Sequence, residues 1–136
     1  MVFDNKCGGI GGQGYTKINN YFFNCDINDF KQHPDLNYAI EHNNENMLNV
    51  SKKWYKQIKE FNLINDEQIK ELINLNDKIG CPKKEHIHND LPLCNSNTIK
   101  YIYFGLLNIK YIMDNKLEDF DFIEIGGGYG GQCIIL

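Results

Sequence analysis

The sequence predicts a mainly α-helical N-terminal region that leads into one β-strand, a glycine-rich turn and the start of a further helix. Two observations indicate this fold class. Apolar residues recur at helical spacing in the segments 49–61, 66–76 and 96–113. Farther along, an apolar run at 120–125 is followed at once by a glycine-rich segment at 126–131. A strand that turns sharply into a helix through glycines is typical of α/β proteins that bind nucleotides.

These patterns divide the chain into three parts. We expect an irregular, glycine-containing segment over residues 1–29, a helical region over 30–116, and the start of an α/β core over 117–136. The first part contains CGGIGGQGY at Cys7–Tyr15. No apolar strand precedes these glycines, so they lack the context of a nucleotide-binding loop and are interpreted as turn-rich.

The helical region begins with a predicted helix over 35–45, because Pro34 is well suited to the first turn of a helix. In the next helix, 49–61, four apolar residues share one face. The helix at 66–76 can be capped by Asn65 or Asp66. The apolar residues expected to form the core between these helices and the next are Val50, Trp54, Ile58, Leu72, Ile73, Ile102, Leu106 and Leu107.

The segment 77–95 contains Gly80, Pro82 and Pro92 and is predicted to be a long loop. Ser96 or Thr98 is then expected to cap the helix that runs to residue 113. This helix carries apolar residues on more than one face, so we expect it to be largely enclosed by the rest of the protein.

The glycine-rich segment fits two ligand classes. Gly126, Gly128 and Gly131 match GxGxxG, the pattern of dinucleotide-binding folds. Glu124, Gly126, Gly128 and Gly130 match ExGxGxG. The acidic residue favours the second pattern, because a carboxylate repels a pyrophosphate but attracts the ammonium and sulfonium groups of S-adenosylmethionine. A glycine turn that binds no ligand stays open as a third interpretation.

The second pattern resembles the first motif of class I S-adenosylmethionine-dependent methyltransferases. Together with three upstream blocks, it resembles the sugar O-methyltransferase family in this class. The four blocks are FKQHPDLNYAIEH (Phe30–His42), NDKIGCP (Asn76–Pro82), TIKYIYFG (Thr98–Gly105) and EIGGGYGGQC (Glu124–Cys133).

The resemblance implies a helical N-terminal region followed by a Rossmann-like methyltransferase core. It implies S-adenosylmethionine as the cofactor and a sugar or glycan as the methyl acceptor. Glu124, Gly126, Gly128 and Gly130 would lie around the methionine end of the cofactor. No residue is assigned as the catalytic base.

Five residues follow Gly131. The ribose-binding carboxylate of the comparable dinucleotide fold lies about 20 residues past its glycines. We therefore expect a truncated core, with weak or absent cofactor binding and no methyl transfer by this chain alone, and whether it acts as an enzyme stays open. Self-association through the strand edge is expected. The alternatives are a non-catalytic helical module that docks to a partner chain and a fragment of an NAD-dependent oxidoreductase.

Four possible metal ligands lie in the loop, namely Cys81, His86, His88 and Cys94. Their spacing matches no standard zinc pattern, so we expect no metal site. Either histidine is an alternative candidate for a general base, since imidazole titrates near neutral pH.

The composition limits the partners and the cellular location that we expect for the protein. The net charge of −4 argues against a nucleic-acid partner, and every basic residue is a lysine. The apolar stretches are too short to cross a bilayer. The five cysteines form no CxxC pair, which favours a reduced, cytoplasmic protein.

Overall fold

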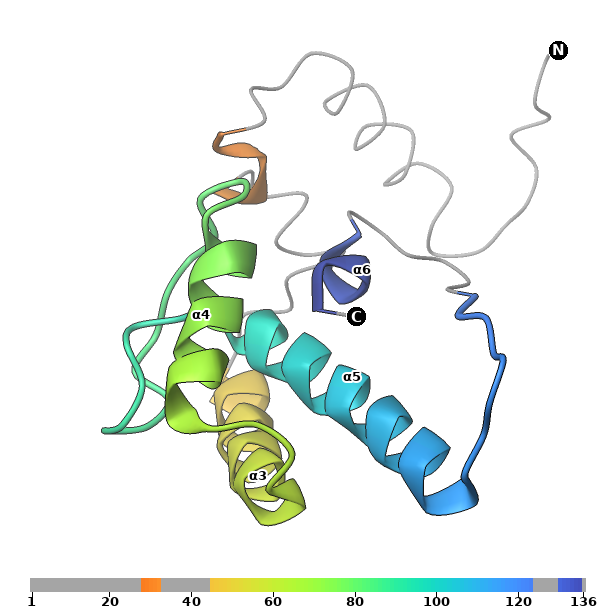
Figure 1. Cartoon of the computed structure of the whole chain (residues 1–136). Coiled ribbons are helices and arrows are strands. Elements are labelled where there is room, and N and C mark those ends of the chain that lie inside the picture. Colours follow the sequence, from red (N-terminus) through yellow and green to blue (C-terminus); the bar gives the residue numbers. More distant parts are fainter. Residues whose placement is uncertain (1–27, 33–44, 124–129, 136) are drawn as a thin grey trace, which may run out of the picture.

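The computed structural model of the chain describes residues 28–32, 45–123 and 130–135. In this part the chain forms only helices and connecting segments, so the mainly helical architecture is confirmed. The helices, which Figure 1 labels apart from the first, are the 3-10 helix η1 (Phe30–Gln32), α3 (Glu45–Phe61), α4 (Asp66–Asp77), α5 (Ser96–Asn115) and α6 (Gly131–Ile135).

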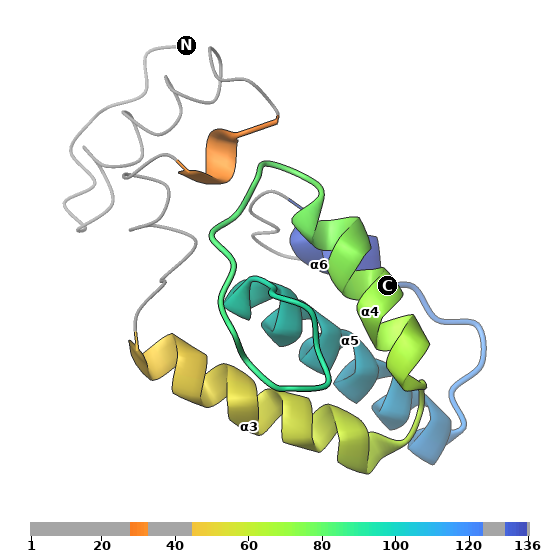
Figure 2. The same ribbon diagram turned by 90° about the vertical axis from the view of Figure 1, so that its left-hand side faces the viewer.

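Helix α5 is the central element of the described structure, because it packs against α3, α4 and α6. Helix α6 also contacts α4, and Figures 1 and 2 show it beside the end of α4 and the start of α5. Apolar side chains of three helices and the loop fill the centre. These buried residues are Tyr55, Ile58, Ile69, Ile73, Ile87, Leu91, Cys94, Ile99, Ile102 and Leu106.

The start of α4 is fixed by a capping box. The Asn65 side chain accepts a hydrogen bond from the Gln68 N–H, and the Gln68 side chain accepts one from the Asn65 N–H, each at 2.9 Å. Two N–H groups that the helix itself cannot pair are therefore satisfied. Asn65 was one of the two predicted caps.

The start of α5 differs from the prediction. Asn95 is the cap, and its side chain accepts a hydrogen bond from the Asn97 N–H at 2.8 Å. Neither predicted cap occupies this position, because Ser96 and Thr98 both lie inside the first turn of the helix. The Ser96 hydroxyl donates to Glu85 and the Thr98 hydroxyl to Asp77.

The predicted loop between α4 and α5 is present, but it also contributes to the core. Ile87, Leu91 and Cys94 are buried among the helices. A two-way backbone bridge between Glu85 and Cys94, with N···O distances of 2.9 and 3.1 Å, holds the loop in a closed shape. Figure 2 shows the loop crossing in front of the first turns of α5.

The expectation that α5 is largely enclosed is wrong. One side of the helix is exposed, including Leu107, which was predicted to be in the core and is 38% exposed. Phe104, Tyr111 and Met113 are exposed as well. The other core predictions are supported to different degrees, since Ile58, Ile73, Ile102 and Leu106 are buried whereas Val50, Trp54 and Leu72 are half-buried.

The described part of the predicted strand does not form a strand. Residues 120–123 have no regular secondary structure, and their side chains are exposed. A strand needs a neighbour with which to exchange backbone hydrogen bonds, and the described residues supply none here. The rest of that strand, the predicted helix before Glu45, and the glycines of Cys7–Tyr15 lie outside the described residues.

Among the described helices, none combines the length and the apolar character that a membrane crossing requires.

Replacing Ile102 by alanine should lower the free energy of unfolding by about 2–5 kcal/mol, because its side chain is fully buried at the centre of the helices. Urea titration followed by circular dichroism measures this change. Ile123→Ala is the matched control, since Ile123 is 84% exposed, and it should leave the midpoint unchanged. Equal effects of the two variants would contradict the proposed core.

Candidate functional site

Four helical elements meet at one end of the structure, which we call the η1–α6 end. It comprises η1, the last turn of α4 with the following Gly80 and Cys81, the first turns of α5, and α6. Figures 1 and 2 show α6 beside the end of α4 and the start of α5, and η1 next to the segment that follows α4. The geometry of this end is built from three sets of contacts.

The first set joins η1 to the segment after α4. The Lys31 N–H donates a hydrogen bond to the Gly80 carbonyl at 2.9 Å, and the Gln32 side chain donates one to Cys81 Sγ at 2.9 Å. Gly80 has a φ of +74°, and a Cβ at this position would lie 2.5 Å from the Phe30 ring. Only glycine fits both the backbone conformation and the close approach of η1.

The second set joins the end of α4 to the start of α5 through a buried carboxylate. Asp77 accepts hydrogen bonds from the Thr98 hydroxyl and, at 2.8 Å, from the Asn95 N–H. The Asn76 amide in turn donates to the Thr98 hydroxyl at 3.2 Å. All four residues are less than 5% exposed. Because a buried carboxylate is stable only when its oxygens are paired, these donors determine how the two helices meet.

The third set joins the glycine-rich segment to α5. Gly130 has a φ of +78°, and Gly131 is the first, buried residue of α6. The Gln132 side chain donates a hydrogen bond to the Tyr101 carbonyl at 3.1 Å. Ile135 packs against the core. The helix that follows the glycines is therefore fixed to the helical region.

Parts of all four sequence blocks meet at the η1–α6 end. The described ends of these blocks are 30–32, 76–82, 98–105 and 130–133, and the contacts above join the first to the second, the second to the third, and the third to the fourth. Segments that are far apart in the sequence therefore form one continuous arrangement.

Of the four predicted cofactor-binding residues, the structure describes Gly130. Its left-handed backbone agrees with a tight turn, and no atom of the described residues, apart from its chain neighbours, lies within 4 Å of the position that a Cβ would take. The described part of the chain therefore leaves the backbone at this glycine sterically open, as close approach of a ligand requires. Glu124, Gly126 and Gly128 lie outside the described residues.

The loop histidines belong to a different region. His86 Nε2 lies 3.0 Å from the Asn89 side-chain oxygen. His88 Nδ1 lies 3.3 Å from the Asp90 carboxylate and accepts a hydrogen bond from the Asp90 N–H at the same distance. The His88 ring packs against the buried Tyr55 ring, with 4.9 Å between centroids.

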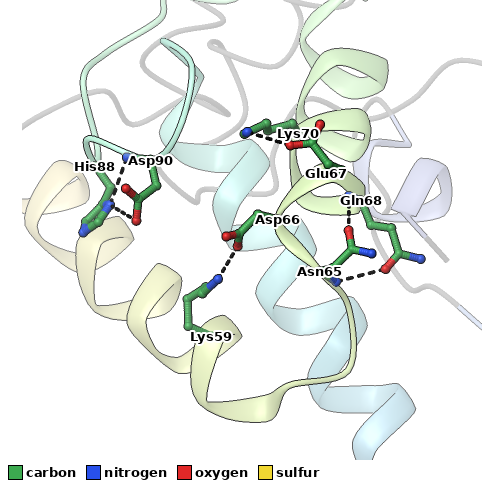
Figure 3. A network of polar contacts seen from close by, with 8 residues as sticks. All are labelled: Lys59, Asn65, Asp66, Glu67, Gln68, Lys70, His88 and Asp90. Carbon is green, nitrogen blue, oxygen red and sulfur yellow. Dashed lines mark hydrogen bonds and ion pairs between the residues drawn. The ribbon is translucent and has the colours of Figure 1, made fainter.

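Helix α4 separates this part of the loop from α6. Figure 1 places the loop on one side of α4 and α6 on the other, and Figure 3 shows His88 and Asp90 on the loop side. The structure therefore does not bring His88 to Gly130 and Gly131, the described part of the glycine-rich segment. Within the described residues, no group of three or more histidine, cysteine or acidic side chains is arranged to hold a metal ion.

Two surface ion pairs lie at the start of α4, one joining it to α3 and one within α4 itself (Figure 3). Lys59 of α3 donates a hydrogen bond to Asp66, which raises the pKa of the lysine and lowers that of the carboxyl. Lys70 pairs with Glu67 at 2.9 Å. These groups are solvated, so their contribution to stability is small.

The two described loop cysteines differ sharply. Burial raises the pKa of the Cys94 thiol to about 12, and the nearby Asp77 carboxylate acts in the same direction. Cys94 is therefore an unreactive thiol in the core. Cys81 is exposed and accepts the hydrogen bond from Gln32.

No protein-family model, curated protein or solved structure matches this chain.

The Asp77 network was not predicted from the sequence. Its signal is the placement of polar residues at helix boundaries, in NLND at the end of α4 and CNSNT at the start of α5. Such residues are usually interpreted as solvated caps. Sequence spacing cannot show that two boundaries face one another and that their side chains pair in the interior.

Replacing Asp77 by asparagine should lower the free energy of unfolding by about 1–3 kcal/mol. An amide has one acceptor oxygen where the carboxylate has two, so either the Asn95 N–H or the Thr98 hydroxyl loses its acceptor. Chemical denaturation measures the cost. Asp114→Asn is the control, because Asp114 is exposed, and its unfolding midpoint should stay near that of the unchanged protein.

The raised pKa of Cys94 predicts a loss of stability at high pH. The buried thiol keeps its proton up to about pH 12, whereas the ordinary thiol value is 9.0. The contribution of the protonated thiol to the free energy of unfolding is therefore fully present below pH 9, and it is lost as the pH rises from 9 toward 12. The difference in unfolding free energy between the unchanged protein and Cys94→Ala should shrink over this range. A constant difference from pH 7 to 11 would contradict the assignment.

Proposed function

We propose that this chain carries the helical region and the cofactor-binding turn of an S-adenosylmethionine-dependent sugar O-methyltransferase. The observation that carries the proposal is the η1–α6 end, where parts of all four family-like blocks meet. If the four blocks resembled the family by chance alone, there would be no reason for direct contacts to join them in the structure.

The conformation at Gly130 gives the proposal further support. Its positive φ and the open space beside its Cα fit a backbone turn that a ligand approaches closely. When bound, S-adenosylmethionine supplies a sulfonium methyl group for transfer to a sugar hydroxyl. Glu124 would attract the positive charges of the cofactor, and Gly126, Gly128 and Gly130 would admit its methionine end.

The helical region would orient the turn. Gln132 and Ile135 hold α6 on α5 and against the core, so the segment that leaves the glycines has a defined direction. Positioning of reactants is a large part of catalysis for a displacement that needs no covalent enzyme intermediate. His88 is not proposed as the base, because α4 lies between it and α6.

Binding of S-adenosylmethionine should be weak but selective, with a dissociation constant on the order of millimolar. The motif residues are expected to contact only the methionine end of the cofactor. Titration of ¹⁵N-labelled protein, followed by NMR, should show shifts of the glycine resonances with S-adenosylmethionine and none with NAD. Gly130→Val should abolish these shifts, because valine disfavours a positive φ.

Leu93→Ala is the control variant, since Leu93 is an exposed loop residue, and its titration should match that of the unchanged protein. Selective shifts with NAD would support the oxidoreductase alternative instead. An unchanged spectrum with both ligands would overturn the proposal.

A second candidate function, a helical module that docks to another chain, is favoured by the exposed apolar side of α5. This candidate is compatible with the first, because the hydrogen bonds at the η1–α6 end involve Thr98 and Tyr101 of α5, whereas Leu107, Tyr111 and Met113 lie on its exposed side.

A further inference from the structure

Helix α5 carries a row of exposed residues, together with the half-buried Lys100, that has the spacing of a helix-pairing surface. Phe104, Leu107 and Tyr111 are 39%, 38% and 63% exposed, respectively. Lys100 precedes them by one turn and Asp114 follows by one turn. We call these five residues the α5 stripe. Their spacing of four, three, four and three residues keeps them on one side of the helix and matches the repeat of paired helices.

The described part of the chain covers this side of α5 only in part, since the Phe104 ring lies against the Trp54 ring of α3, with 6.1 Å between centroids, and still stays 39% exposed. The buried residues Ile99, Ile102 and Leu106 lie on another side of the helix, where α5 packs in the core. Figure 1 shows α3 and α4 together on one side of α5. A helix with an apolar side that its neighbours leave largely exposed has a surface suited to a further partner.

The charges of the stripe indicate what that partner is. Lys100 lies about two turns before Leu107, and Asp114 lies about two turns after it. If a second α5 packs antiparallel across Leu107, each Lys100 comes within reach of the partner's Asp114. A parallel arrangement would instead place like charges together, which is unfavourable.

Asp114 is able to take part in such a contact. Its carboxylate already accepts a hydrogen bond from Lys110 at 3.0 Å, yet 60% of its side chain stays exposed. A carboxylate has two oxygens and can pair with two cations. The stripe has apolar residues at its centre and opposite charges at its two ends. Two copies of the stripe that are related by a two-fold axis are therefore complementary to each other.

We propose that the α5 stripe is the contact between two copies of this chain, which pair antiparallel about a two-fold axis at Leu107. One helix from each copy makes the contact. The buried area therefore lies at the low end of stable interfaces, which bury at least about 1,200 Å². The dimer is expected to be weak, with a dissociation constant in the micromolar range.

Sedimentation velocity of the whole chain over a wide concentration range tests the proposal. The unchanged protein should shift from monomer to dimer as its concentration rises. Leu107→Glu should weaken the dimer by about tenfold or more, because two carboxylates then face each other at the axis. Leu75→Glu is the matched control, since Leu75 of α4 is an exposed leucine outside the stripe, and it should leave the dimer intact.

A charge exchange tests the antiparallel register. Lys100→Glu alone should weaken the dimer, because its carboxylate faces the partner's Asp114. The double variant Lys100→Glu/Asp114→Lys should recover the dimer, because it restores opposite charges with the signs reversed. Circular dichroism confirms that each variant is folded.

Three results would overturn the proposal. The first is a monomer at every concentration. The second is equal loss of the dimer in Leu107→Glu and Leu75→Glu. The third is a double variant that associates no better than Lys100→Glu. None of these results depends on cofactor binding, so failure here leaves the proposed function unaffected.

Discussion

The buried Asp77 carboxylate is the interaction on which the arrangement of the helices depends. It receives hydrogen bonds from the Asn95 backbone and from the Thr98 hydroxyl, and so ties the last residue of α4 to the beginning of α5. An unpaired carboxylate in this position would be strongly unfavourable. The two helix ends therefore have few alternative positions. Helix α5, which contacts all of the other long helices, takes its direction from this connection.

The helices of the central region were predictable because their apolar residues recur at helical spacing. Ile58, Ile73 and Ile102 were expected in the core and are fully buried or nearly so. The pattern could not show which side of α5 would be covered, because apolar residues occur on several of its sides. Leu107 was therefore wrongly placed in the core. How much of a helix is covered depends on how many other elements pack against it. This depends on how the whole chain folds.

The site was predictable only in part. The glycine-rich segment was recognised from its residues, and Gly130 has the backbone conformation that such a turn needs. The η1–α6 end was not predicted, because its contacts join residues that are far apart in sequence, such as Lys31 with Gly80 and Gln132 with Tyr101. The described part of the predicted strand, 120–123, shows the same limit, since a strand depends on a neighbour that local sequence does not specify.

The loop between α4 and α5 has a consequence for how the sequence can change. Loops usually tolerate inserted and deleted residues, because they run over the surface. In this loop, Ile87, Leu91 and Cys94 are buried in the same core as the helix residues. A single added residue between them would move one of these side chains out of the interior. Variation in length should therefore be confined to the neighbouring exposed positions, and this stretch should keep its length as strictly as a helix of the core.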